Sequence, residues 1–457
     1  MLIQAIIFFK RRKGRYFADL LDGIGAVAPI LKHQPSAVEI LDSDVISRAR
    51  RNLNIAPLCG FIQGDPQAIL VVEFFGDTSE QAQHKADKLA ADLKKQKLGY
   101  AWPVITQPAE QLKVWTVRKN GLGLLLGMKG ERKPLAFIED ACVPVEVLPE
   151  YIDKILKFCR GRDVPVAMYA HASVGTIHVR PILDLKQQHD IDNMKAIADF
   201  VFTLVPKYGG AMSGEHGDGR NRSPFLAGYF GPQIYGALKQ VKRLFDPAGL
   251  MNPGVIIDPE PMDHNLRYGT DYPQFAEPTF YHYRDDGAFA AAVEMCTGVG
   301  ACRQNLAGAM CPSYRATLDE RHSTRGRANA LRLAMTGQLG PRALTSGALF
   351  EILDLCLSCK SCKAECPSNV DLARLKSEFL QRYHDARGAS LRDLIVAGST
   401  RSAALISGWS APLVNRIQNT RFFRILLEKI ARFDSRRQLP EYARVPFNKW
   451  FDQHPSP

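Results

Sequence analysis

The residues best suited to chemistry lie in one short stretch with four cysteines. They are Cys356, Cys359, Cys362 and Cys366, and Pro367 follows the last of them. The spacing C-x2-C-x2-C-x3-C-P is that of an iron–sulfur ligand run, in which the cysteine before the proline ligates a different cluster from the first three. A zinc site is the alternative, but zinc sites favour two separated CxxC pairs and no terminal Cys-Pro. The stretch therefore predicts an iron–sulfur centre.

An upstream group of cysteines can supply the partners that this ligand run requires. It consists of Cys296, Cys302 and Cys311. Cross-ligation predicts one complete [4Fe–4S] set, formed by Cys356, Cys359, Cys362 and Cys311. The remaining set is Cys296, Cys302 and Cys366. It is one ligand short, because Val299 occupies the position of the missing cysteine. It could hold a three-iron cluster, a four-iron cluster with a non-cysteine ligand, or no cluster.

Two glycine-bearing stretches, AHASVGTIHVRP and MSGEHGDGRNR, carry a second candidate site. The first contains His171 and His178, and Gly175 between them permits a turn that brings the two histidines towards each other. If this stretch is a strand, His178 and Arg180 face the same side, because alternate residues of a strand share a face.

The second of these stretches contributes adjacent polar side chains, Glu215 and His216, flanked by glycines. Two imidazoles and a carboxylate suit a borderline divalent metal, with zinc first and manganese or iron next. The alternative is that the histidines are ordinary buried side chains and that Glu215 caps a loop. A third stretch, KQVKRLFDPAGLMNPGVI, contains two turns and is expected to be a loop that closes a domain.

Strand and helix patterns alternate around these stretches. Strands are expected at residues 68–77 and 135–148, and a strand–turn–strand unit at 164–181. Helices are expected at 79–96, with Ser79 as the N-cap, and at 114–127, 148–162 and 190–209. The connections favour an antiparallel sheet covered by helices on one face, and the fold class is therefore α+β.

The chain is expected to have four parts. They are a sheet domain at 1–257, a proline-rich linker at 258–285, a helical iron–sulfur domain at 286–388 and a basic helical tail at 389–457. The pattern between the cysteine groups is helical, with Ser323 or Thr324 as a cap, which favours an all-α ferredoxin domain over the small β-hairpin kind.

Composition indicates a cytoplasmic protein. Seven of the ten cysteines lie between residues 296 and 366, which favours metal ligation in a reducing compartment over disulfides. No apolar run approaches the roughly 18 residues that span a bilayer. At the start of the chain, charges follow a short apolar run, whereas a secretory signal has them before it.

The net charge is +12, and the segment from Arg382 to Lys449 is rich in arginine. Such a segment could contact an anionic surface, such as the inner membrane face, or an acidic partner. A solvated basic surface is the alternative. Nucleic acid is not expected, because no zinc finger, RNA-binding aromatic motif or basic zipper is present.

Taken together, these stretches resemble the C-terminal domain of FAD-linked oxidases of the vanillyl-alcohol oxidase type. That family includes D-lactate dehydrogenases, glycolate oxidase subunits and D-2-hydroxyglutarate dehydrogenases. The resemblance rests on His-x6-His, then SGEHGDG, then FDPAGLMNPG, in this order. The cysteine part, with CTGVGACR, MCPSY and HSTRGRANALR, is similar to large bacterial fusions of flavin and iron–sulfur domains. The resemblance covers roughly residues 15 to 450.

The resemblance implies oxidation of a D-2-hydroxy acid by FAD, with electrons passing to the iron–sulfur domain and then to a quinone or carrier protein. It implies that His171, His178 and Glu215 bind zinc or another divalent metal and that His216 is the base. It also implies that Arg118 holds a substrate carboxylate and that Asn252 and His216 contact FAD. Arg180 stands where relatives often have an asparagine that contacts substrate, and it could supply a second carboxylate clamp because a guanidinium binds carboxylates bidentately. A surface charge on a helix is the alternative for Arg118.

The chain departs from the family pattern at both ends. The family has a separate FAD-binding domain before the part that is matched, and the first 60 residues are too short to form one. The fusions also continue beyond residue 457. The chain is therefore expected to be truncated at both ends and to need a separate FAD-binding domain or chain. The alternative is an electron-transfer or assembly subunit without turnover of its own.

Overall fold

The computed structural model describes residues 2–9, 18–52, 55–306 and 308–454. These residues form two compact units. One comprises Met1–Ala343 and Glu351–Lys376, and the other comprises Leu344–Phe350 and Ser377–Pro457. Within the described residues, none of the helices combines the length and the apolar character needed to cross a bilayer.

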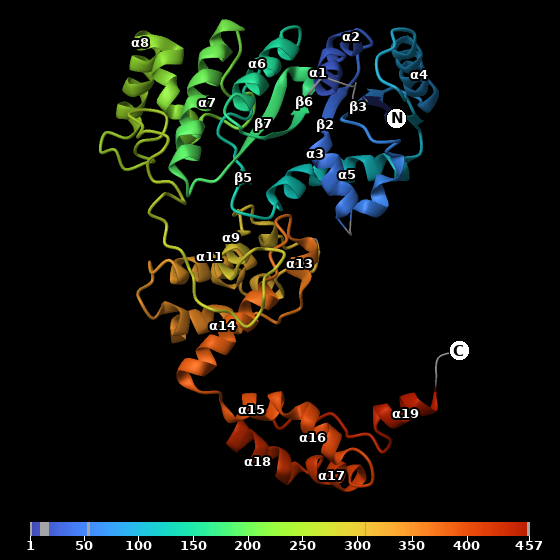
Figure 1. Cartoon of the computed structure of the whole chain (residues 1–457), viewed down its shortest axis with the longest axis vertical. Helices are drawn as coiled ribbons and strands as arrows, with labels where there is room; N and C mark the ends of the chain where they lie inside the picture. The colour runs from blue at the N-terminus through green and yellow to red at the C-terminus, as the bar shows by residue number, and fades with distance from the viewer. Residues whose placement is uncertain (1, 10–17, 53–54, 307, 455–457) are drawn as a thin grey trace. The chain divides into compact units, whose positions relative to one another are not determined.

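A seven-stranded sheet in the order β4-β1-β3-β2-β6-β7-β5 is the frame of the first unit (Figure 1). All its neighbouring strands are antiparallel. The strands are β1 Leu2–Phe9, β2 Ala37–Asp42, β3 Ala68–Phe75, β4 Val104–Ile105, β5 Lys133–Pro134, β6 Val166–His171 and β7 Thr176–Leu183. The predicted α+β architecture with an antiparallel sheet is confirmed.

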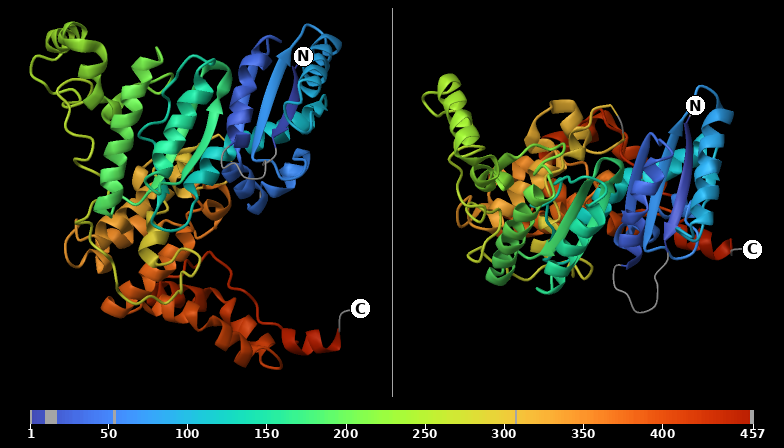
Figure 2. Two further views of the ribbon diagram at one scale, coloured as in Figure 1. Left: turned by 45° about the horizontal axis from the view of Figure 1, so that its top comes forward. Right: turned by 90° about the horizontal axis from the view of Figure 1, so that it is seen from above.

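Helices cover both faces of this sheet, whereas the sequence predicted one covered face (Figure 2 gives two further views). One face packs against α1 Ala18–Gly25, α2 Val27–Leu31, α4 Ser79–Lys95, α6 Leu148–Arg160 and α7 Gln188–Lys207. The other face packs against α3 Ser43–Arg51 and α5 Pro108–Leu126. Adjacent strand residues therefore enter different cores: Ile7 and Leu70 face the first layer, and Ile6 and Val71 face the second.

Two local predictions were wrong. The N-cap of α4 is Thr78, whose side chain accepts a hydrogen bond from the Gln81 N–H, and Ser79 is the first helical residue. The strand predicted at 135–148 is mostly irregular, although strand β5 ends just before it and Cys142 forms isolated bridges with Thr176 and Ala211. Its backbone and side chains instead support the candidate site.

The rest of the described chain is helical apart from loops. After α8 Gly219–Phe245, the cysteine region contains α9 Phe289–Glu294, α10 Pro312–Thr317, α11 Thr324–Met335, α12 Gly347–Asp354, α13 Ser361–Glu365 and α14 Leu372–Arg387. Ser323 is the N-cap of α11. The tail contains α15 Leu391–Ala397, α16 Ser399–Ile406, α17 Ala411–Gln418, α18 Arg421–Ala431 and α19 Phe447–Gln453. The predicted all-α character of these parts is confirmed.

Candidate functional site

The β6–β7 hairpin brings the two predicted histidines together. Tyr169 pairs with His178 and His171 pairs with Thr176, so the rings of His171 and His178 lie at right angles with centroids 5.2 Å apart. Gly175 makes the turn with φ of 72°. A Cβ atom there would lie 1.9 Å from the Val143 carbonyl oxygen, so the turn requires glycine for both its backbone angle and its close packing.

Replacing Gly175 by alanine is expected to destabilise this turn by about 3 kcal/mol, because it adds a clash to the left-handed backbone strain. Gly209 is the matched control, since it has φ of 66° but open space where a Cβ atom would lie. Its alanine variant should lose only about 1–2 kcal/mol. Melting temperatures by circular dichroism compare the two variants, and equal losses would contradict the packing argument.

Asp140 holds the loop that carries Glu215 and His216. Its carboxylate accepts hydrogen bonds from the Ser213 hydroxyl (2.5 Å) and from the backbone N–H groups of Glu215 and His216 (both 2.9 Å). Burial alone would raise the pKa of Asp140, but these hydrogen bonds outweigh it and lower the pKa. The carboxylate is therefore ionised at neutral pH and fixes the loop beside the hairpin.

Three imidazoles converge on the Glu215 carboxylate. Its Oε1 atom lies 3.6 Å from Nε2 of His171, 3.2 Å from Nε2 of His178 and 2.9 Å from Nε2 of His216. Donor atoms of His171, His178 and Glu215 all lie within 4.8 Å of one another. The donor atoms also lie within 4.8 Å of one another in two other sets. These sets are Glu139, His178 and His216, and Asp140, Glu215 and His216.

The electrostatics of this cluster suit a divalent metal. His178 is only 1% exposed, and burial together with the nearby cations lowers its pKa to about 3. It is therefore neutral at physiological pH and can donate a lone pair. The hydrogen bond to Glu39 raises the pKa of His171. Two imidazole nitrogens and a carboxylate oxygen form a donor set that fits zinc or a related ion.

Two buried carboxylates that the sequence analysis missed orient the outer histidines. Glu39 Oε1 lies 2.8 Å from Nδ1 of His171, and its Oε2 accepts a hydrogen bond from Nε of Arg118 (2.9 Å). Glu139 pairs with Arg180, and its Oε1 lies 3.6 Å from Nδ1 of His216. A carboxylate behind a histidine fixes which ring nitrogen faces the metal.

The other predicted site residues have different surroundings. Arg118 and Arg180 are buried and border the site through these glutamates, and their guanidinium groups lie 5.0 and 5.9 Å from the Tyr169 ring. Asn252 lies in the exposed loop after α8, with φ of 46°. Substrate contact by the arginines and FAD contact by Asn252 stay predictions. An acid within an apolar strand, as in AVEILD, is the sequence signal that could have found Glu39.

The cysteines of the first predicted cluster line one small cavity. Its lining includes Cys311, Cys356, Cys359 and Cys362, with Thr324 and Arg327. The Cys311 sulfur accepts a hydrogen bond from the Thr324 N–H (3.0 Å) and lies 2.9 Å from its hydroxyl oxygen. All ten cysteines of the chain are free thiols. This grouping fits a cluster held by four thiolates, one of them from the upstream group.

The remaining three cysteines also lie near one another. Burial raises the pKa of the Cys366 thiol, and the nearby Cys296 and Cys302 add to this effect. The Arg325 N–H donates a hydrogen bond to the Cys302 sulfur (3.3 Å). Val299, at the position of the missing ligand, is 54% exposed. The three alternatives for this set therefore stay open.

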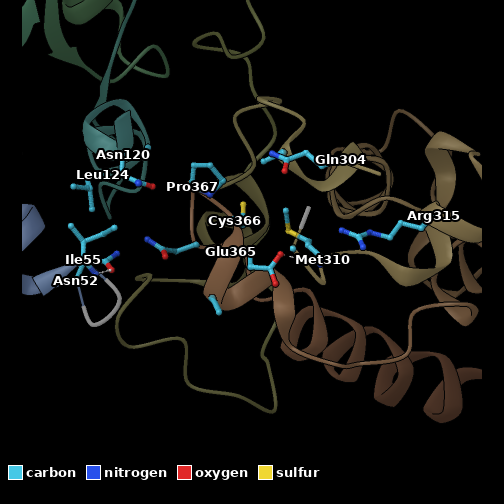
Figure 3. Close-up of a pocket in the computed structure, with 15 residues that line it drawn as sticks. Asn52, Ile55, Asn120, Leu124, Gln304, Met310, Arg315, Glu365, Cys366 and Pro367 are labelled. Carbon is cyan, nitrogen blue, oxygen red and sulfur yellow. Dashed lines mark hydrogen bonds between the residues drawn. The ribbon is translucent and has the colours of Figure 1, made fainter. Parts of the chain in front are cut away.

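Helix α5 packs against the loop that carries Cys366. A Cβ atom on Gly123 would lie 2.7 Å from Pro367, and one on Gly127 would lie 2.9 Å from the Asn369 amide nitrogen. Beside this contact is a cavity of about 310 Å³, lined by Cys366, Pro367, Asn120 and Leu124 among others (Figure 3). Because α5 also carries Arg118, one helix connects the histidine cluster with the cysteine region.

Comparison with known proteins adds two family matches. Residues 14–256 match the model described as "FAD linked oxidases, C-terminal domain", and residues 292–370 match the "4Fe-4S dicluster domain".

Individual relatives point the same way. The chain is 29% identical to a D-2-hydroxyglutarate dehydrogenase of Pseudomonas putida over 468 aligned positions, covering 92% of this chain and 45% of the relative. It is 30% identical to the Escherichia coli K12 protein of that name, and the alignment covers 81% of this chain and 41% of the relative. It is 27% identical to the glycolate oxidase subunit GlcD of E. coli K12, and the alignment covers 48% of this chain and 42% of that subunit. The chain thus spans less than half the length of these relatives.

Proposed function

Because the chain belongs to the FAD-linked oxidases through their C-terminal domain, we propose that it forms the substrate and electron-transfer part of an FAD-dependent D-2-hydroxy-acid dehydrogenase. One observation carries this proposal: the Nε2 atoms of His171, His178 and His216 converge within 3.6 Å on one carboxylate oxygen of Glu215. This convergence supports a metal site with a neighbouring base at one end of the hairpin.

The residues divide the work as follows. His171, His178 and Glu215 would hold zinc or another divalent metal, and Glu39 orients His171 for this role. With metal and FAD bound, the site gains a Lewis acid for the substrate oxygens and a hydride acceptor for the α-carbon. His216 takes the hydroxyl proton at Nε2, while Glu139 faces its Nδ1. Loss of that proton and of a hydride converts the 2-hydroxy acid to a 2-oxo acid.

We expect the arginines to select carboxylate substrates. A guanidinium group has five N–H donors, so Arg118 and Arg180 can each hold a glutamate and still attract a substrate carboxylate. Two such arginines favour a dicarboxylate, and D-2-hydroxyglutarate is therefore the first candidate, with D-lactate and glycolate next. The names of the relatives support D-2-hydroxyglutarate as the first candidate.

The remaining partners follow from the same proposal. A separate FAD-binding domain or chain supplies contacts to the adenosine and phosphates of FAD, and Asn252 and His216 contact the flavin. With clusters bound by the two cysteine groups, the iron–sulfur region would provide a route for electrons to a quinone or carrier protein.

We place the protein in the cytoplasm, with its basic tail at the inner membrane face. Residues 389–457 contain eleven lysines and arginines against five acids. Trp409 and Phe422 of the same segment are 94% and 79% exposed. Cationic and aromatic side chains together suit an anionic lipid surface.

An assay of the anaerobically purified chain with an FAD-binding partner polypeptide tests the function. We expect reduction of an artificial electron acceptor with D-2-hydroxyglutarate, D-lactate or glycolate, and none with L-2-hydroxyglutarate. Absence of turnover with all these acids, in a preparation that contains metal, flavin and iron, would favour a non-catalytic electron-transfer or assembly subunit instead.

A further inference from the structure

We propose that two buried cations, Arg327 and Lys376, raise the reduction potential of the cluster held by Cys311, Cys356, Cys359 and Cys362. The cluster would then accept electrons readily from the flavin. The inference rests on the proposed function, because it presumes a cluster in this cavity. It assigns a task to two buried cations that take no part in the histidine site.

Arg327 is a fully buried cation at the wall of the cysteine cavity. It lies on α11, is 1% exposed and lines the same cavity as the four cysteines. Its Nε donates to the Ile352 carbonyl (2.9 Å), its Nη1 to the His322 carbonyl (2.6 Å) and its Nη2 to the Ser313 hydroxyl (3.0 Å). In the described part of the chain, these hydrogen bonds of Arg327 all go to uncharged groups.

Lys376 is a second buried cation, and it binds the backbone of the ligand run itself. It lies on α14, is 9% exposed, and its Nζ donates to the carbonyl oxygens of Cys356 (2.7 Å) and Asp354 (2.9 Å). The side chain of Asp354 also attracts it electrostatically, but that residue is exposed and its charge is screened by solvent. Both Lys376 and Arg327 interact electrostatically with Cys356.

Burying a cation among uncharged hydrogen-bond acceptors costs folding free energy unless a negative charge lies close by. The cysteines are the source of that charge. Burial lowers the pKa of the Arg327 guanidinium, and the nearby cysteines oppose this effect: Cys356, Cys311, Cys362 and Cys302. A cluster held by four thiolates is anionic in both redox states, so it provides the compensating charge that the site otherwise lacks.

The same charges affect the redox equilibrium. Reduction adds one negative charge to an already anionic cluster, and nearby positive charge in a buried site stabilises the reduced state more than the oxidised state. The Thr324 N–H that donates to the Cys311 sulfur acts in the same direction. Removing one cation should therefore lower the midpoint potential and slow electron transfer from the flavin.

Redox titration of the full chain, purified anaerobically and monitored by electron paramagnetic resonance, tests the inference. The relevant signal is the one that disappears in the Cys311→Ser variant. We expect Arg327→Gln and Lys376→Met each to shift its midpoint to a more negative potential. Arg327→Lys keeps the positive charge, so its cluster should have a midpoint potential near that of the wild type. Arg321→Gln is the matched control, because Arg321 is exposed and pairs with Asp319.

The outcomes separate this inference from the proposed function. Wild-type potentials in both Arg327→Gln and Lys376→Met, with full iron content, would overturn the inference and leave the dehydrogenase proposal intact. Wild-type chain without iron would overturn the cluster assignment and the inference with it. If Arg327→Gln does not assemble the cluster, the midpoint potential measured in Lys376→Met tests the inference by itself. This variant should still assemble the cluster, because Lys376 contacts the ligand run through carbonyl oxygens only.

Discussion

Replacing His216 by glutamine should lower kcat for the D-2-hydroxy acid by about 10²- to 10⁴-fold, the usual contribution of a general base. His216 is suited to this role because its Nε2 lies 2.9 Å from the Glu215 carboxylate and its Nδ1 faces buried Glu139. Glutamine keeps a polar group in the loop but cannot take a proton. The metal content should stay unchanged, because His171, His178 and Glu215 remain in place.

The control for this variant is His189→Gln. His189 is exposed on α7, and its ring lies 3.1 Å from the Asn193 amide nitrogen, so its loss should leave kcat within a factor of about two. Steady-state kinetics and metal analysis of the two variants make the comparison. A His216→Gln enzyme that retains wild-type kcat would contradict the role of base, and one that loses its metal would make His216 a ligand instead.

Replacing Cys311 by serine should remove one whole [4Fe–4S] cluster, although Cys311 lies far upstream of the ligand run. The structure places Cys311 in the cavity with Cys356, Cys359 and Cys362, and a cluster with three thiolates in a site built for four is poorly held. Substrate should still reduce the flavin in the complex with the FAD-binding partner. Transfer to the external acceptor should be almost completely lost.

Iron analysis and rapid mixing distinguish these two steps. Cys59→Ala is the control, because Cys59 is buried in the core beside α3 and α5 and lies far upstream of both cysteine groups in sequence. Full iron content and normal electron transfer in Cys311→Ser would show that the ligand set is different. Loss of flavin reduction as well would mean that the variant damages the protein more broadly.

The histidine hairpin was predictable because its geometry is local. A strand alternates its side chains, and Gly175 is the residue that a left-handed turn requires, so the spacing of His171 and His178 places both rings on one side. The hydrophobic pattern likewise predicted helices α4, α5, α6 and α7. Cap positions were less certain, as the shift from Ser79 to Thr78 shows, because neighbouring Ser and Thr residues can both cap a helix.

The supporting carboxylates could not be found in this way because their contacts are long-range. Strand β2, which carries Glu39, pairs with β6 only because the sheet order is not the sequence order. No spacing rule connects position 39 with position 171. The segment at 135–148 was read as a strand from its apolar residues, yet Asp140 has φ of 71° and its hydrogen bonds go to the 213–216 loop. The hydrogen bonds between Asp140 and this loop outweighed the local strand propensity of the segment.

Metal analysis of the wild-type chain and of Glu215→Ala, purified side by side, tests the central claim most directly. We expect one equivalent of a divalent metal, zinc first, beyond the iron of the clusters in the wild type, and its loss in Glu215→Ala. The exposed glutamate Glu150, which pairs with Lys154, provides the control variant Glu150→Ala, and that variant should keep the metal. Absence of such a metal from the wild type, or its full retention in Glu215→Ala, would contradict the assignment of His171, His178 and Glu215 as its ligands.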